Sequence, residues 1–282
     1  MIVCHKRSND KKCEGRVMAA DKPPAARERN PIAALVRVLD AMAVMDEPAV
    51  GVRELARLLG SPPSSLQRTL ESAEDLSLLS STNGRWELGW ELFRLASLVQ
   101  ARRPFQGATV VLEHLSERTE ETALLAVYDL RRHERMFVAA AQSTRSVRFV
   151  PELFSWLPMH AGASALAILA HRPEAERREL YARGLPALTS TTITSAEALE
   201  DVLAKVRVDG YAVSHDEVNL GASGVAVPIV TAAGVTSSVA VIVPQQRFDE
   251  KLKKQLVDAV TAAAASLGQR LGDPVSGLEA VS

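Results

Sequence analysis

Four polar side chains lie close together in one segment of the chain: Ser64, Ser65, Gln67 and Arg68. The planar guanidinium of Arg68 could bond two acceptors on the edge of a guanine base, while hydroxyl and amide groups could bond bases or phosphates. These side chains would point away from a buried helical stripe of Leu66, Leu70 and Ala73. The pattern indicates recognition of a DNA groove, but any amphipathic surface helix would carry a comparable polar face.

Two further helices are predicted just before this segment. The first begins at Asn30-Pro31, a capping residue followed by proline, and its buried face would hold Leu35, Leu39 and Met42. The second runs from Val52 to Leu59 and stops at Gly60, and its inward positions would be Leu55, Leu58 and Leu59. Ser61-Pro62 repeats the cap-and-proline signal and predicts the start of the third helix.

A hairpin is predicted directly after the third helix. Leu78 to Ser81 can pair with Arg85 to Leu88 across Asn83-Gly84, because both turn residues tolerate positive φ. Three helices followed by a hairpin are typical of a winged helix-turn-helix, in which the third helix enters the major groove. Arg85 would lie at the tip of the wing, beside a phosphate or the minor groove, and Arg53 would contribute from the second helix.

The charge of this region argues against DNA binding. Residues 30–103 contain eight arginines and nine acidic residues, whereas neutralisation of phosphates by basic residues normally supplies much of the affinity for DNA. The positions of the arginines offset this charge balance in part, because four of them could lie on one face: Arg53, Arg57, Arg68 and Arg85. A dimer would also double the contacts. A small-molecule-binding module with weak or vestigial DNA binding therefore stays open as an alternative.

Length and composition predict a soluble protein of two domains. The chain has 282 residues, of which 47% are hydrophobic, and one domain typically takes about 100–200 residues. It has no apolar run near the roughly 18 residues that span a bilayer, and no apolar N-terminal segment of the secretory kind. Both cysteines, Cys4 and Cys13, lie in a polar leader, so a reducing cytoplasm is the expected compartment.

Residues 1–29 are predicted to be a disordered basic leader. They contain eight basic and four acidic residues, with Pro23-Pro24 near the end. A solvated tail is favoured over an arm that adds phosphate contacts, and Met18 offers an alternative start. A zinc site is not expected here, since Cys4, His5 and Cys13 lack a fourth ligand.

The winged helix-turn-helix is predicted to occupy residues 30–89, and a linker helix residues 90–104. The linker carries more apolar positions than one neighbour would cover: Leu92, Phe93, Leu95, Ala96, Leu98 and Val99. We therefore expect it to join the two domains and to pack against a second subunit. Arg102-Arg103-Pro104 should end it, because the residue before a proline avoids the helical conformation.

Residues 105–271 are predicted to form an α+β domain in which helices flank an antiparallel sheet, followed by a tail at 272–282. Helices are expected at Val110 to Arg118, Ala161 to Ala170, Pro173 to Ala182, Ser195 to Val208 and Phe248 to Leu267. Strands are expected at Thr122 to Tyr128, Met136 to Gln142, Gly224 to Val230 and Val235 to Val243. A charged turn from Arg131 to Glu134 would join the first two strands.

From about Asn30 to Leu271 the chain resembles the IclR family of transcriptional regulators. Pro62 to Gly89 is similar to the family's recognition helix and wing, including Arg68, Asn83-Gly84 and Leu88-Gly89. Leu157 to Ala170 matches a helix that opens after Pro-x-His. Thr189 to Ile229 matches a longer series: a Thr-rich strand, a helix, Gly-Tyr-Ala, Asp-Glu, then Gly and Ala-x-Pro. Several motifs in the right order make the resemblance specific.

The resemblance implies a C-terminal GAF-like domain that binds a small effector, usually a carboxylic or aromatic acid. One part of its pocket would be the helix start after Met159-His160, where backbone N–H groups at Ala163 and Ser164 could hold an anion. The loop around Asp-Glu would add Ser214, Ala222 and Gly224, and the last strand would add Ala240 and Ile242.

The last strand departs from the pattern of acid-binding members, which carry hydroxyl groups there and an acid or thiol on the loop. Ala240 and Ile242 are apolar, and Gly224 offers space. A small polar ligand would leave groups unpaired at roughly 1–3 kcal/mol each. We therefore expect a larger, more apolar effector, such as an aromatic acid. The alternative, that Ala240 and Ile242 are ordinary core residues, stays open.

Catalysis is not expected. His160 with Ser164, or His215 beside Asp216, could suggest acid–base chemistry, but Gly162 to Leu166 lacks the second glycine of a nucleophile elbow. The sequence shows no Gly-rich phosphate loop and no metal-spaced cluster, so no cofactor or metal is predicted. His160 is interpreted as a structural hydrogen-bonder. The resemblance implies a homodimer or homotetramer on double-stranded operator DNA, whose affinity the effector changes.

Overall fold

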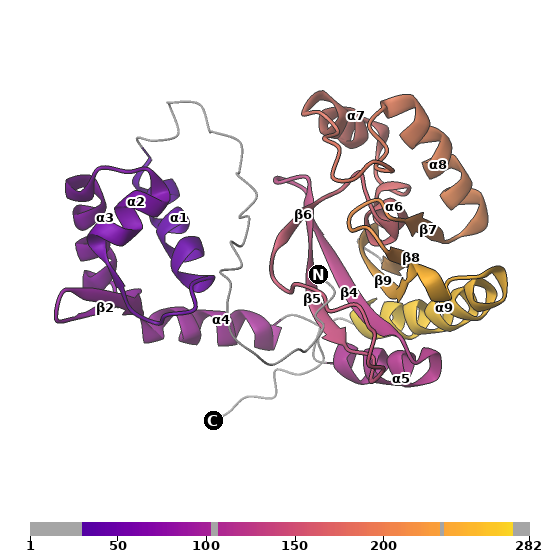
Figure 1. Cartoon of the computed structure of the whole chain (residues 1–282), viewed down its shortest axis with the longest axis horizontal. Coiled ribbons are helices and arrows are strands. Elements are labelled where there is room, and N and C mark those ends of the chain that lie inside the picture. Colours follow the sequence, from indigo (N-terminus) through magenta and orange to yellow (C-terminus); the bar gives the residue numbers. More distant parts are fainter. Residues whose placement is uncertain (1–29, 103–106, 232–233, 273–282) are drawn as a thin grey trace. The chain divides into compact units, whose positions relative to one another are not determined.

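The computed structural model describes residues 30–102, 107–231 and 234–272, and the chain divides into two compact units between residues 103 and 104 (Figure 1). The expectations for the leader, for the end of the linker at Arg103-Pro104 and for residues 273–282 lie outside the described residues. Within the described part of the chain, no helix is long and apolar enough to cross a membrane.

The first unit is a winged helix-turn-helix. Its elements are α1 (Pro31–Ala43), β1 (Val50–Gly51), α2 (Val52–Leu59), α3 (Pro63–Asp75), β2 (Leu79–Thr82), β3 (Arg85–Leu88) and α4 (Trp90–Arg102). The first three helices and the small sheet enclose a core that includes Val38, Leu55, Leu70, Leu79 and Trp86. The stripe predicted for the third helix is confirmed, because Leu66, Leu70 and Ala73 are all buried.

Local signals in the sequence set the ends of the first two helices. The Asn30 side chain accepts hydrogen bonds from the backbone N–H of Ile32 at 2.9 Å and of Ala33 at 3.4 Å, as an N-cap residue should. Gly60 ends α2 in the left-handed conformation at φ +61°. The inward position expected for Leu58 is wrong: its side chain is 54% exposed, and Leu55 and Ala56 hold the core positions of this short helix.

The third helix begins one residue later than predicted. Pro62 is the N-cap, in an extended conformation at ψ 132°, and Pro63 is the first helical residue. The reason is that the residue before a proline is pushed out of the helical region, so Pro63 keeps Pro62 extended. Ser61 is consequently not the N-cap, and its hydroxyl instead donates to the carbonyl of Leu59 at 3.4 Å.

The predicted hairpin is confirmed, with Asn83 at φ +53° and Gly84 at φ +74°. Its strands pair in the register Leu79 with Leu88 and Thr82 with Arg85. The short strand β1 adds to the other edge of β3, so the sheet order is β1-β3-β2. Trp86 lies on the central strand and is buried, which fixes the wing to the helical core.

The second unit is α+β, as predicted. Its helices are α5 (Ala108–Thr119), α6 (Ala163–Leu169), α7 (Glu174–Ala182), α8 (Ala196–Asp209) and α9 (Glu250–Gly272), with a 3-10 turn η3 at Gln245–Arg247. Its strands are β4 (Thr122–Asp129), β5 (Glu134–Ala141), β6 (Trp156–Pro158), β7 (Ala212–His215), β8 (Ala222–Thr231) and β9 (Gly234–Pro244). The six strands form one antiparallel sheet in the order β6-β5-β4-β9-β8-β7.

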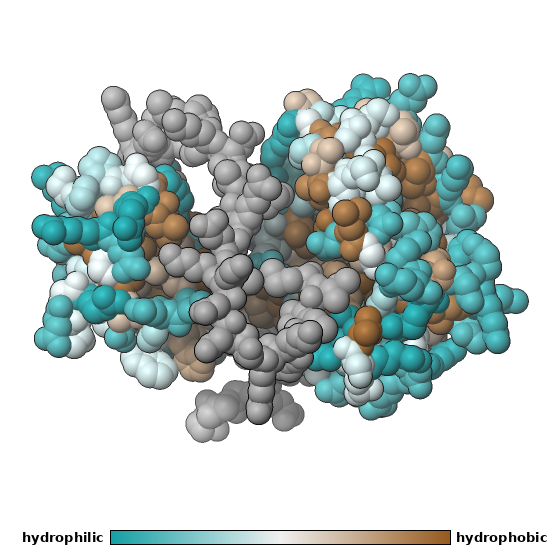
Figure 2. All heavy atoms as spheres, viewed as in Figure 1, coloured by the Kyte–Doolittle hydropathy of each residue, from teal (hydrophilic) through white to brown (hydrophobic). Residues whose placement is uncertain are grey.

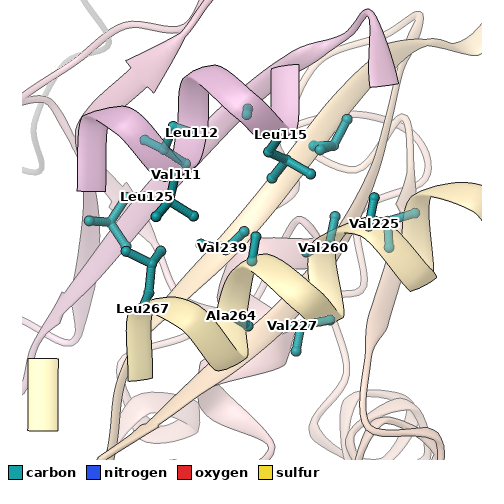
Figure 3. Packing of buried hydrophobic residues seen from close by; sticks show 14 of the residues in the cluster. Val111, Leu112, Leu115, Leu125, Val225, Val227, Val239, Val260, Ala264 and Leu267 are labelled. Atoms are coloured by element: carbon teal, nitrogen blue, oxygen red, sulfur yellow. The ribbon is translucent and has the colours of Figure 1, made fainter. Parts of the chain in front are cut away.

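Apolar layers lie on both faces of this sheet. On one face, Val111, Leu112 and Leu115 of α5 meet Val260 and Leu267 of α9 over the strand residues Val225, Val227 and Val239 (Figure 3). On the other face, α6, α7 and α8 pack over Leu124, Ala226 and Ala240. Each fully buried aliphatic side chain contributes about 1.5–3 kcal/mol. In the view of Figure 2, hydrophilic residues predominate along the outer edge of this unit.

Three details of the second unit differ from the sequence predictions. The Thr-rich segment expected as a strand is a turn, because the hydroxyls of Thr189 and Thr192 donate to the carbonyls of Asp216 and Glu217 at 2.6 and 2.7 Å. Strands β6 and β7 were not predicted, since they are only three and four residues long. Strand β5 begins at Glu134, the last residue of the predicted turn, and therefore includes Arg135.

Candidate DNA-binding surface and effector site

The outer face of α3 is polar and exposed. Ser64, Ser65 and Arg68 are exposed, and Gln67 is partly buried. Gln67 donates from Nε2 to Oε1 of Glu71 at 2.9 Å, one helical turn later. In the unbound chain the Gln67 amide is therefore engaged by its own helix, and base contacts would require it to exchange this partner. Arg53 is likewise exposed, on α2.

Arg85 is held by the chain itself. Its Nη2 lies 3.0 Å from the carboxylate of Glu47, and the same nitrogen donates to the carbonyl of Ala49. Its side chain is still 46% exposed, so the ion pair with Glu47 is solvent-screened and contributes little to stability. A phosphate could replace Glu47 at this arginine.

Glu74, one of the acids that weaken the charge balance, positions the wing. Its Oε1 accepts from the backbone N–H of Ser81 at 3.1 Å and from the Ser81 hydroxyl at 2.7 Å. These two bonds join the C-terminal part of α3 to strand β2. The acid thus connects the two elements that a groove-binding surface needs in a fixed arrangement.

The structure brings together most of the residues predicted for the effector site. A Cβ atom on Gly224 would lie 3.4 Å from Cβ of Ala163 and 3.5 Å from Oγ of Ser214. Gly224 pairs with Ile242 across β8 and β9, on the sheet face that α6 covers. Ala222 starts β8 and pairs with Pro244, one step farther along the same face.

Ala240 is more deeply placed than the other predicted site residues. Its side chain is 2% exposed, and it belongs to the core cluster that contains Leu124 and Leu166. Its register partners are Ala226 on β8 and Leu124 on β4. These surroundings match an ordinary core position, one of the two interpretations that the sequence left open.

Two of the backbone N–H groups at the start of α6, those of Gly162 and Ala163, have partners within the chain. The N–H of Ala163 donates to Oγ of Ser214 at 2.8 Å, and the N–H of Gly162 donates to Oε2 of Glu217 at 2.7 Å. The sequence had predicted that this place could hold an anion. In the structure the side chain of Glu217 lies next to this place, bonded to the N–H of Gly162.

Arg135 is the residue of this site that the sequence analysis missed. Its side chain lies on β5 and the residue is 2% exposed. Its Nε donates to Oγ of Ser164 at 2.9 Å, and its Nη1 donates to the carbonyl of Pro158. A Cβ atom on Gly162 would lie 3.1 Å from its Nη2. The guanidinium therefore lies directly against the start of α6.

Burial shifts the pKa values of Arg135 and Glu217 in the directions that favour the neutral form of each side chain. Desolvation lowers the pKa of Arg135 to about 10, and the negative charge of Glu217 opposes that shift. Desolvation likewise raises the pKa of Glu217, against the hydrogen bond from Gly162 and the charge of Arg135. At neutral pH Arg135 keeps its positive charge, so a buried cation lies beside the predicted pocket.

A period-two pattern could have revealed Arg135. Strand residues two apart share a face, and Phe137 is buried on the same strand. Starting the strand at Glu134 would have turned Arg135 inward with Phe137. The run of charges before it favoured a turn instead.

His160 and Ser164 do not form a catalytic pair. Nε2 of His160 lies 2.9 Å from the carbonyl of Pro186 and must donate to it, since a carbonyl only accepts. Burial lowers the pKa of His160, which keeps its ring neutral. The Ser164 hydroxyl accepts a hydrogen bond from Arg135. The backbone carbonyl of Ser164 accepts one from the buried hydroxyl of Ser238 at 2.9 Å. His160 is therefore a structural hydrogen-bonder, as predicted.

Comparison with known proteins gives consistent results. Residues 97–269 match the family model described as bacterial transcriptional regulator IclR C-terminal. The chain is 31% identical to the HTH-type transcriptional regulator BhcR of Paracoccus denitrificans over 86% of this chain and 88% of that protein. It is 29% identical to the transcriptional repressor IclR of Escherichia coli over 73% of this chain and 77% of the repressor.

A solved structure aligns over most of the chain as well. It is the crystal structure of an IclR homolog from Microbacterium hydrocarbonoxydans complexed with 4-hydroxybenzoate. The TM-score is 0.72 at 27% sequence identity, and the alignment covers 86% of this chain and 99% of the other.

Proposed function

The chain belongs to the IclR family of bacterial transcriptional regulators, and from this premise we propose that its α3 face and wing bind operator DNA. We assign DNA binding to residues 30–89, the linker to 90–104 and effector binding to 105–271. The observation that carries the proposal is the exposed row of Ser64, Ser65 and Arg68 on a helix whose other side is buried. Arg68 would bond a guanine edge, and Arg53 and Arg85 would contact phosphates.

A gel shift with the DNA upstream of the protein's own gene tests this proposal. We expect a shift whose affinity falls steeply as salt concentration rises, because bound phosphates release counterions. Absence of a shift, both with and without ligand, would favour the alternative of a small-molecule-binding module with vestigial DNA binding. The alternative draws support from the even charge balance and from the pairing of Arg85 with Glu47.

For the effector we propose a carboxylic acid with an apolar, aromatic body. The apolar side of the site would be formed by Ala163, Gly224 and Ile242, while Ser164 and Ser214 supply hydroxyl groups. The Microbacterium hydrocarbonoxydans homolog supports this class, since it was crystallised with 4-hydroxybenzoate. Calorimetric titration with pyruvate and with benzoate-type acids tests the size argument, and tight binding of pyruvate would contradict it.

We further propose that the protein works as a homodimer or homotetramer joined in part through α4. This helix exposes apolar side chains on much of its surface, among them Trp90 at 84%, Phe93 at 66% and Leu98 at 48%. A single chain leaves these groups in water, whereas a second copy would cover them. A dimer would place two α3 helices about 34 Å apart, on successive turns of one face of the DNA. Since its target is DNA, we assign the protein to the cytoplasm.

A further inference from the structure

Arg135 and Glu217 flank the start of α6 without pairing to each other. Within the described residues, no ion pair joins them, although each is close to Gly162: Glu217 accepts its N–H at 2.7 Å, and Nη2 of Arg135 lies 3.1 Å from where its Cβ would be. Two of the three guanidinium nitrogens are bonded, through Ser164 and Pro158. Among the described residues no hydrogen bond of Nη2 is seen, and Nη2 is not fully buried, since the buried side-chain nitrogen without a partner there is Nε of Arg148.

A buried guanidinium with a free nitrogen is suited to a carboxylate. Bonds between two charged groups are stronger than neutral ones, and the planar fork of arginine matches the two oxygens of a carboxylate. A carboxylate that enters beside Gly162 could therefore bond Nη2 while Nε and Nη1 keep their partners in the chain.

Glu217 could make room for that anion by a side-chain rotation. Its backbone carbonyl is held by the hydroxyl of Thr192 at 2.7 Å, so the loop can stay in place while the carboxylate moves. The residue is only partly buried, which leaves its side chain a route to solvent. Two carboxylates close to a single arginine would repel each other, so one of them should leave or take up a proton.

We propose that Arg135 is the residue that binds the effector's carboxylate, and that Glu217 is an internal anion that the effector displaces from Gly162. This inference rests on the proposed function, namely that the second unit binds a carboxylic acid. It assigns the preference for acids to a side chain on β5, and it makes loop 216–221 the first segment to respond to the ligand.

Calorimetry on the full chain with a matched pair of ligands tests the assignment. The pair is 4-hydroxybenzoate and its neutral amide, 4-hydroxybenzamide, which have nearly the same shape. We expect the wild type to bind the acid about ten- to hundredfold more tightly, as a bond to a buried charge should allow. Arg135→Met should remove this preference by lowering the affinity for the acid more than the affinity for the amide, and Arg135→Lys should restore part of it.

Two further variants serve as controls. Arg183→Met removes a positive charge from an exposed position in the same unit, and it should leave the preference for the acid intact. Glu217→Gln removes the internal anion, so it should bind the acid more tightly than the wild type. It also keeps the proposal falsifiable if Arg135→Met fails to fold.

Several results would overturn the assignment. They are an equal loss of acid and amide binding in Arg135→Met, an unchanged acid affinity in Glu217→Gln, or a wild-type protein that binds neither ligand. A gel shift on the same preparation separates the two proposals. If the wild type shifts DNA but shows no preference for the acid, the assignment of Arg135 fails and DNA binding stands.

Discussion

Arg68 and Arg135 show that the surroundings of an arginine determine what its side chain can bind. Arg68 is exposed on α3, where its charge is hydrated and free to meet a base or a phosphate. Arg135 is 2% exposed and is held by Ser164 and Pro158. Removal of Arg68 should therefore affect binding alone, whereas removal of Arg135 leaves buried acceptors without a donor and should also affect stability.

The first prediction concerns Arg68. Arg68→Ala should cost about 1–3 kcal/mol of operator binding, because a bidentate contact to a base is lost. Effector affinity of the free protein should not change. Fluorescence anisotropy with operator and scrambled DNA measures the effect. If wild type and variant each bind the two DNAs equally, Arg68 has no part in base recognition.

The second prediction concerns pH and Glu217. Burial raises the pKa of Glu217 in the folded chain above its ordinary value of 4.5, so the folded state holds this proton more tightly than the unfolded state does. The stability that the protonated Glu217 contributes is fully present below the pKa of this group in the unfolded chain. It is lost as the pH rises through the pKa of the group in the folded chain.

Glu217→Gln has no such proton to lose. The free energy of unfolding of this variant, relative to the wild type, should therefore increase as the pH rises from the ordinary value of 4.5 toward neutrality. Urea denaturation of both proteins across that range measures the difference. A difference that does not vary with pH would contradict the prediction.

At the scale of elements, α3 and the wing act as one module. The turn at Asn83-Gly84 fixes the register of β2 and β3, and Glu74 of α3 accepts two bonds from Ser81 of β2. Gly89 closes the module, since its N–H donates to the carbonyl of Leu78 at 2.8 Å. The sequence signals of helix and hairpin therefore produce a surface only through the contacts between them.

The third prediction concerns Gly89, which lies close to the backbone of Ser77. A Cβ on Gly89 would lie 2.2 Å from the carbonyl oxygen of Ser77, which is backbone and cannot rotate away. Gly89→Ala should destabilise the first unit by about 1–3 kcal/mol, the usual cost of overpacking. Urea denaturation measures it, followed by tryptophan fluorescence in a background in which Trp90 and Trp156 are replaced by Phe, so that Trp86 alone reports. Gly51→Ala is the matched control, because a Cβ there meets nothing within 4 Å, and an equal loss in both variants would contradict the explanation.

The fourth prediction tests the role of α4 in assembly. Leu98→Glu places a charge on the apolar face of this helix, where Leu98 is 48% exposed. It should shift the protein toward monomers and weaken operator binding at least about tenfold, because a monomer makes half of the contacts. Val208→Glu, at an 86% exposed position on α8, is the control. Sedimentation analysis in which both variants behave like the wild type would exclude α4 from the interface.

At the scale of the whole molecule, regulation requires that effector and DNA affect each other's binding. Thermodynamic linkage makes this coupling reciprocal: if the effector changes operator affinity by some factor, the operator must change effector affinity by the same factor. In the proposed dimer or tetramer the coupled states would differ in how copies of the chain assemble, so the coupling would belong to the oligomer rather than to one residue.

The fifth prediction is that this coupling amounts to about 1–3 kcal/mol, or roughly five- to 150-fold in affinity. Calorimetry of 4-hydroxybenzoate in the presence and absence of operator DNA measures one side, and anisotropy of the operator with and without the acid measures the other. Two factors that agree would establish linkage. Effector binding that leaves operator affinity unchanged would show that the ligand does not regulate DNA binding.

The sequence alone was sufficient for features that depend on a few neighbouring residues. Asn30 caps α1, Ser195 caps α8 through a bond to the N–H of Ala198, and Asn83-Gly84 turns the wing. These structures were predictable because backbone conformation and capping are determined by residues two to four positions apart. The α+β class followed from the periodicity of apolar residues in the same way.

The tertiary structure decided which polar groups share the proposed effector site. Ser214 bonds the N–H of Ala163 from 51 positions away, and Arg135 bonds Ser164 from 29 positions away. Such pairs arise because strand order and helix packing bring distant segments together, and a local pattern contains no information on that register. For this reason the sequence predicted an open anion site at α6, and only the folded chain has Glu217 within it and Arg135 beside it.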